Sequence, residues 1–205
     1  MFKKTFHIPH FVITTLCYPI KTRIYLRKES SLSQKGTHMK IRKATVAELD
    51  SIMTIYTDAR EYMRESGNKT QWSGGYPSEG LVRADIDAGD LYVVTEDGDP
   101  ARLLGVFYYR EGNDPTYEKI YEGCWQNEDP YGVIHRIAVA KDSHGRGVAA
   151  FCFSYGFSLC KNLKIDTHRD NLPMQRSLLK NGFLPCGVIY LENGEERLAF
   201  QKCDI

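Results

Sequence analysis

The sequence has no apolar run near the roughly 20 residues that a membrane-spanning helix needs. The apolar stretch at residues 11–17 is short, is bracketed by Pro9 and Pro19, and lacks the small-residue cleavage site of a signal peptide. The six cysteines form no Cys-x-x-Cys pair, and the six histidines do not cluster with them. We therefore expect no metal site and no disulfide framework, and free thiols in a reducing, cytoplasmic compartment.

The chain also lacks a strong charge of either sign, because its formal net charge is +1. Residues 1–38 carry seven Lys or Arg and one acid, whereas residues 39–205 carry twenty basic and twenty-five acidic residues. The main body is mildly acidic, so nucleic acid is not its expected partner. Met39 begins a regular pattern, and we interpret residues 1–38 as a basic extension, either disordered or not part of the native start.

Residues 39–205 predict one α/β domain with a mixed, mostly antiparallel sheet between layers of helices. The expected strands are residues 40–44, 91–96, 102–110, 133–140, 163–167, 183–190 and 197–202. The expected helices are residues 46–65, 79–88, 148–162 and 171–181. A long loop, residues 111–130, separates the two halves.

A glycine-rich turn joins the strand at 133–140 to the helix that begins at Val148. Exposed N–H groups at a helix N-terminus form an anion site, and phosphate is the usual occupant. Gly145 and Gly147 allow backbone to approach a phosphate, and Arg146 adds a charge. The turn matches neither the P-loop nor the dinucleotide fingerprint.

This stretch resembles the acyl-CoA motif of the GNAT superfamily of N-acetyltransferases, Arg/Gln-x-x-Gly-x-Gly/Ala. His144-Gly145-Arg146-Gly147-Val148-Ala149 occupies the motif, and IAVAKDS precedes it. Downstream, THRDNLPMQRSLLKNGF is similar to the second signature of the family, with Asn171, Lys180, Gly182 and Phe183 at the matching positions. The resemblance extends over residues 39–205 in the order of elements.

The resemblance implies a set of contacts with acetyl-CoA as co-substrate. The backbone at 137–139 would pair with the pantetheine arm, the glycine turn would hold the pyrophosphate, and the acetyl group would lie where strands 133–140 and 163–167 splay apart. The implied cofactor-binding residues are Ile137, Ala138, Val139, His144, Gly145, Arg146, Gly147, Val148, Ala149 and Asn171.

Two positions depart from the family pattern. His144 replaces the family's Arg or Gln, which puts a side-chain contact in doubt while leaving the backbone cradle intact. Leu178 stands where the family often has a Tyr that protonates the leaving thiolate.

Acetyl transfer to an amine needs a proton acceptor, and His135 is our candidate base. Strand alternation places Val133, His135, Ile137 and Val139 on one face, and Arg136 on the other as a structural residue. A core histidine bound to backbone is an equally good interpretation of His135. We interpret His168 and Asp170 as turn and cap residues.

The long loop and the glycine-rich segment near residue 72 carry aromatic side chains that could wall an acceptor pocket. The alternative is a surface loop that packs its own aromatics. The candidate substrate residues are Trp72, Tyr76, Glu122 and Trp125.

The sequence therefore predicts an N-acetyltransferase that moves an acetyl group from acetyl-CoA to a primary amine by direct attack in a ternary complex. The alternative is an acyl-CoA-binding sensor with weak catalysis. The acceptor would be a small-molecule or peptide amine, and the last strands would allow a homodimer.

Overall fold

The computed structural model describes residues 39–204, so the predicted extension at residues 1–38 lies outside the described residues. The described chain forms a seven-stranded sheet in the order β1-β2-β3-β4-β5-β7-β6. All neighbouring strands are antiparallel except β4 and β5. The strands are β1 (Met39–Lys43), β2 (Leu91–Glu96), β3 (Asp99–Glu111), β4 (Gly132–Val139), β5 (Asn162–Thr167), β6 (Leu184–Tyr190) and β7 (Glu196–Cys203).

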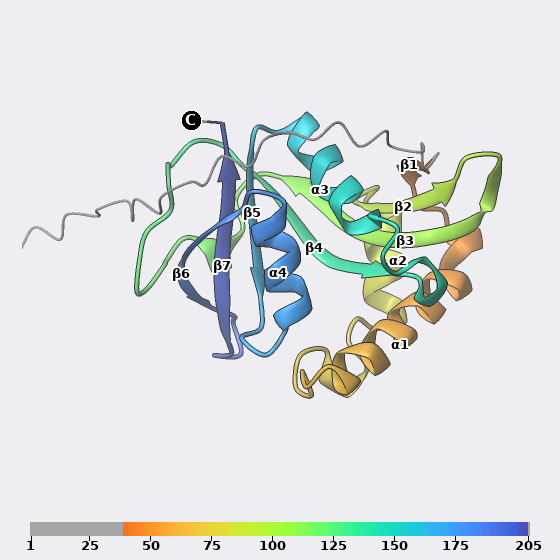
Figure 1. Cartoon of the computed structure of the whole chain (residues 1–205), viewed down its shortest axis with the longest axis horizontal. Helices are drawn as coiled ribbons and strands as arrows, with labels where there is room; N and C mark the ends of the chain where they lie inside the picture. Colours follow the sequence, from red (N-terminus) through yellow and green to blue (C-terminus); the bar gives the residue numbers. More distant parts are fainter. Residues whose placement is uncertain (1–38, 205) are drawn as a thin grey trace, which may run out of the picture. The chain divides into compact units, whose positions relative to one another are not determined.

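Helices cover both faces of the sheet (Figure 1). On one face α1 (Leu49–Glu65) and α2 (Glu79–Asp87) pack on Val93 and Val106. On the other face α3 (Val148–Leu159) and α4 (Leu172–Lys180) bury side chains in one core cluster with Val94, Phe107 and Ile165 of the sheet. The predicted three-layer α/β fold is therefore confirmed. None of these helices is long and apolar enough to cross a membrane.

Four short 3-10 turns link these elements: η1 (Val46–Glu48), η2 (Ser73–Gly75), η3 (Pro115–Tyr117) and η4 (Lys141–Ser143). The predicted helix at 148–162 was too long, because Cys160 is extended and β5 already begins at Asn162. The Asn162 side chain is buried and binds Asn127 and Gln201, which fixes it in the sheet.

The strands β4 and β5 pair only at Gly132 with Leu163 and at Val133 with Lys164. Beyond these residues β4 stays paired with β3, while β5 follows β7 as far as Thr167. The two strands therefore run apart in the middle of the sheet, which confirms the predicted splay, and the divergence is visible in Figure 1.

A β-bulge interrupts β4 beside this split. Val106 pairs with Ala138 but Tyr108 pairs with His135, so Arg136 and Ile137 together face the single residue Phe107. Arg136 takes up the extra residue with a φ of 48°, in the left-handed region.

The bulge overturns one prediction. Strand alternation put His135, Ile137 and Val139 on one face and Arg136 on the other. In the structure Ile137 and Val139 pack toward α3, whereas His135 and Arg136 both lie against Tyr108 on the opposite face. The extra residue at the bulge reverses the alternation, so Arg136 shares the face of His135.

The long loop before β4 packs its aromatic side chains on the sheet. Tyr117, Trp125 and Tyr131 form a cluster with Val133 and residues of β6 and β7. The ammonium group of the buried Lys164 lies 4.2 Å from the Trp125 ring centroid and 4.0 Å from that of Tyr131. Apolar burial and cation–π contacts therefore order this loop.

Gly105 allows α3 to begin close to the sheet. A Cβ at this position would lie 2.8 Å from Val148 Cγ1 and 2.9 Å from the carbonyl oxygen of Ala138. We expect Gly105→Ala to lower the free energy of unfolding by about 1–3 kcal/mol, the usual cost of overpacking a core.

Urea unfolding of the variant would measure this loss, with Gly80→Ala as the matched control. Gly80 lies in the first turn of α2, and a Cβ there would meet nothing within 4 Å. The control should be neutral or more stable by up to about 1 kcal/mol. Equal stability of the two variants would contradict the close approach of α3.

Candidate active site

A cleft of about 730 Å³ opens where β4 and β5 diverge. Its wall is formed by the loop between α1 and α2, by β4, by the start of α4 and by the turn between β6 and β7. Residues from opposite ends of the sequence therefore meet around the split in the sheet.

The glycine turn lies at the end of the cleft where α3 begins. Gly147 is the N-cap residue of α3, with a φ of 85°, and Gly145 has a φ of 79°. Glycine adopts these angles without strain, and no atom lies within 4 Å of a Cβ built on either residue. The space above the turn is open, so the residues fit a bound pyrophosphate.

The side chains around this turn are already engaged. Arg146 binds the Glu96 carboxylate with both terminal nitrogens, at 2.9 and 2.6 Å. The His144 ring lies 3.2 Å from the Val139 carbonyl oxygen and edge-on to Tyr62. Anion binding here would therefore depend on backbone N–H groups more than on the side chains of the motif.

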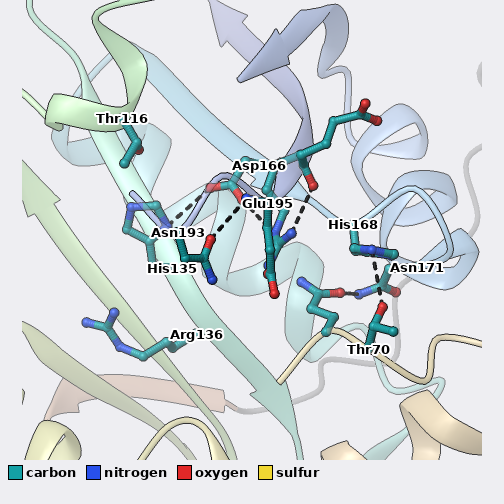
Figure 2. Close-up of polar contacts among 12 residues, drawn as sticks. Thr70, Thr116, His135, Arg136, Asp166, His168, Asn171, Asn193 and Glu195 are labelled. Carbon is teal, nitrogen blue, oxygen red and sulfur yellow. Dashed lines mark hydrogen bonds and ion pairs between the residues drawn. The ribbon is translucent and has the colours of Figure 1, made fainter. Parts of the chain in front are cut away.

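Asn171 is the N-cap residue of α4 and lines the cleft. Its Oδ1 accepts a hydrogen bond from the Met174 N–H at 3.2 Å, and its Nδ2 donates to Gln71 Oε1 at 3.0 Å. Thr70 Oγ1 lies 3.3 Å from His168 Nε2 close by (Figure 2). The loop between α1 and α2 is thereby tied to the start of α4. His168 Nδ1 accepts from the Asp170 N–H in the turn before α4, and Asn171, not the predicted Asp170, is the cap residue.

His135 lies between two carboxylates at the other end of the cleft, and Figure 2 shows one of them, Asp166, beside it. Its Nε2 is 2.9 Å from Asp114 Oδ2, and its Nδ1 is 3.5 Å from Asp166 Oδ1. The ring packs against Tyr108 and Tyr117. An ionised carboxylate only accepts hydrogen bonds, so the short contact with Asp114 places a ring proton on Nε2.

Burial disfavours the charge on Asp114, but hydrogen bonds from His135 and Thr116 outweigh it and lower the pKa of Asp114 to about 2. Asp114 is therefore ionised at neutral pH and holds the imidazole in one orientation.

Asp166 is held by two other side chains. Tyr117 donates its hydroxyl proton to Asp166 Oδ1 at 2.7 Å, and Arg197 Nε lies 3.9 Å from Asp166 Oδ2. Burial, followed by the nearby Asp166, raises the pKa of Tyr117 well above its usual value. The phenol thus stays protonated and keeps Asp166 as an acceptor facing His135.

The predicted substrate residues divide into two pairs. Trp72 and Tyr76 line the cleft, and the Tyr76 hydroxyl accepts a bond of 3.3 Å from Arg136. Trp125 is buried outside the wall and donates to the Tyr117 carbonyl oxygen at 3.0 Å, while Glu122 also lies outside the wall.

Sequence reasoning missed the partners of His135. Asp114 follows no periodic pattern in the long loop, and Asp166 was treated only as part of a strand. The sequence held a signal for Asp166, because a strand parallel to β4 places Asp166 level with His135.

Leu178, at the family's Tyr position, is fully buried among core residues.

The model of the acetyltransferase (GNAT) family matches residues 49–183. A GNAT-family acetyltransferase from Streptococcus agalactiae 2603 is 35% identical, with 82% of this chain and 96% of that chain covered and a TM-score of 0.72. No curated protein sequence matches.

More distant solved structures share the fold. A GNAT-family acetyltransferase from Listeria monocytogenes 4b F2365 is 19% identical, covers 80% of this chain and 94% of that chain, and has a TM-score of 0.60. A NatC complex bound to Gag peptide and CoA is 14% identical over 82% of this chain and 99% of that chain, with a TM-score of 0.54. The chain therefore belongs to the GNAT family and is an N-acetyltransferase in class.

The depressed pKa of Asp114 predicts a pH-dependent contribution to stability. The folded pKa is about 2 against an ordinary value of 3.8, so the ionised carboxylate stabilises the fold above about pH 4 and loses this effect as the pH falls toward 2. The stability difference between the wild type and Asp114→Asn should be full near about pH 6 and shrink below about pH 4.

Urea unfolding at a series of pH values measures this difference. Asp87→Asn, at the exposed end of α2, is the control and should differ little from the wild type at any pH. A difference for Asp114→Asn that stays constant down to about pH 3 would contradict the stabilised carboxylate.

Proposed function

We propose that the protein transfers an acetyl group from acetyl-CoA to a primary amine, by direct attack within a ternary complex. The observation that carries this proposal is the position of the cleft at the split between β4 and β5, with the open glycine turn at one end and His135 with its carboxylates at the other. The amine would be that of a small molecule or a peptide.

The cofactor would occupy the glycine turn and the free edge of β4. Backbone N–H groups from Gly145 to Ala149 would hold the pyrophosphate at the start of α3, where the helix dipole favours an anion. The backbone of Ile137, Ala138 and Val139 lies beyond the residues that pair with β5 and would bind the pantetheine arm. The neighbouring NatC complex, which binds CoA, has the same fold.

The side chains at the cofactor end of the cleft would contribute less to acetyl-CoA binding than the backbone does. Arg146 is already paired with Glu96, and the His144 ring contacts Val139. Asn171 accepts from Met174 with one lone pair and donates from Nδ2 to Gln71 and Met63, so one lone pair remains for the pantetheine.

The acceptor amine would be deprotonated by His135. In the neutral imidazole, with Nε2–H donating to Asp114, Nδ1 would carry the free lone pair. Asp166, next to Nδ1, would attract the ammonium form of the amine. The ammonium form would lose one proton to water before the attack, and His135 Nδ1 would receive the second proton that the nitrogen loses on acetylation.

The remaining candidates shape the acceptor side of the cleft. Trp72 and Tyr76 would pack against the substrate, since both line the wall. Trp125 would act through Tyr117, whose hydroxyl holds Asp166.

We further propose a cytoplasmic protein that pairs as a homodimer. The cysteines at 152, 160, 186 and 203 are free thiols, as a reducing compartment would keep them. Tyr121 and Tyr190 are exposed beside the edge strand β6, a surface suited to a second copy.

An acyl-CoA-binding sensor remains the second candidate function. Leu178 is buried in the core where the family often has a Tyr, so α4 supplies no phenol at that position. Binding of CoA without release of thiol in the presence of any of a broad panel of amines would favour this second function.

Gly147→Val tests the cofactor site, because the new side chain fills the open space above the α3 N-terminus. Isothermal titration of the wild type with acetyl-CoA should give a micromolar Kd, and we expect the variant to bind at least about 100-fold more weakly. The backbone strain of valine at positive φ costs about 1–2 kcal/mol of stability in addition.

Gly98→Val is the matched control for this strain. Gly98 has a φ of 90° and open surroundings in the hairpin between β2 and β3, away from the cleft. The control should lose similar stability but bind acetyl-CoA like the wild type. If both variants or neither lost binding, the cofactor would not lie on the glycine turn.

His135→Ala tests the proposed base. Removal of a general base lowers turnover by about 100-fold or more. We therefore expect a fall of that size in kcat for an acetylated amine, with the Kd for acetyl-CoA within about 2-fold of the wild type. An unchanged kcat would remove His135 from the mechanism and leave the cofactor site intact.

A further inference from the structure

The hydroxyl group of Thr167 has no hydrogen-bond partner within residues 39–204. Thr167 is the last residue of β5, is 1% exposed, and lies in the wall of the cleft. An unpaired buried hydroxyl lowers the stability of the folded state. Such a group at a binding site indicates a partner that arrives with the ligand.

The register of the sheet places Thr167 level with the bulge. Val133 pairs with Lys164 in parallel, so three residues further along Thr167 faces Arg136 and Ile137 across the split. This is about 10 Å beyond the last paired residue. Thr167 therefore borders the part of the split where the proposed pantetheine contacts with β4 begin.

Alternation of side chains along β5 places Thr167 on the face opposite to Asp166 and His135. Leu163 and Ile165 pack toward α3 and α4, and Thr167 follows at the same spacing on that face. Asp166 points to the opposite face, where it contacts His135 and Tyr117. The proposed base and the free hydroxyl thus lie on opposite sides of the split at the same level.

Three other hydroxyl groups of the cleft wall already have partners. Thr70 contacts His168, Thr116 donates to Asp114, and Tyr108 donates to Asp90. Within residues 39–204, Thr167 carries the hydroxyl of the wall that is both buried and unpaired, and Leu178 supplies none at the family's Tyr position.

We propose that Thr167 Oγ1 donates a hydrogen bond to the thioester sulfur and to the departing CoA thiolate, an inference that rests on the proposed function. The amine lone pair forms the C–N bond, the C–S bond breaks, and its electron pair passes to sulfur. The proton of the amine nitrogen goes to His135 Nδ1. Thr167 keeps its own proton, and the thiolate takes one from water as CoA leaves.

Thr167→Val tests the inference, because valine has nearly the same shape and lacks the hydroxyl. Thr167→Ser restores the hydroxyl, and Ser177→Ala removes another hydroxyl of the cleft wall as the control. The first readout is ultraviolet titration of the thiol of CoA bound to the full chain. The bound thiol should ionise at least about one pH unit lower in the wild type than in Thr167→Val, with Thr167→Ser and Ser177→Ala like the wild type.

Turnover and stability supply two further readouts. In Thr167→Val, kcat should fall about 10-fold or more while the Kd for acetyl-CoA stays within about 2-fold. Its Tm should equal or exceed that of the wild type, because the substitution removes an unpaired buried polar group. A purely structural role of the hydroxyl would instead lower Tm.

Identical thiol titrations in the wild type and Thr167→Val would overturn the inference and leave the proposed function standing. An unchanged kcat in Thr167→Val would overturn it as well. Failure of the wild type to bind CoA would overturn the proposed function, and the inference with it. Binding with a shifted thiol titration but no turnover would retain the role of Thr167 toward sulfur and favour a sensor.

Discussion

The separation of β4 from β5 is the constraint on which the rest of the structure depends. Each strand has a second neighbour that holds it, β3 for β4 and β7 for β5, so the two can part after two paired residues without unravelling the sheet. The parting leaves a row of backbone groups on β4 without strand partners. Backbone hydrogen-bonding groups need partners, and an extended ligand arm supplies them as a further strand would.

The bulge at Arg136 converts this split into a two-sided site. One extra residue moves His135 to the face of the long loop, while Ile137 and Val139 turn toward α3. A regular strand would place all three on one face and crowd the base against the cofactor. Because of the bulge, the groups that handle the amine and those near the cofactor approach the split from opposite sides.

Local pattern and two short motifs were enough to predict the order of elements, the splayed strands and the family. Long-range packing accounts for what they missed. Asp114 reaches His135 only because Tyr117 and Trp125 anchor the loop on the sheet, and no periodicity within the loop specifies that path. The bulge escaped prediction because an extra residue in a strand leaves no mark in its composition. The end of α3 was misplaced because the buried contacts of Asn162 outweigh helix periodicity.

At the acceptor end of the cleft, Tyr117, Asp166 and His135 contact one another in that order, and each side chain positions the next. Tyr117 stays protonated because it is buried and lies beside Asp166. The Tyr117 hydroxyl donates a hydrogen bond to Oδ1 of Asp166, and Arg197 Nε lies near Oδ2. Asp166 is thereby held facing Nδ1 of His135, whose other nitrogen contacts Asp114. A positively charged amine that enters here meets a carboxylate and a lone pair together, so binding the ammonium form brings it to the group that removes its proton.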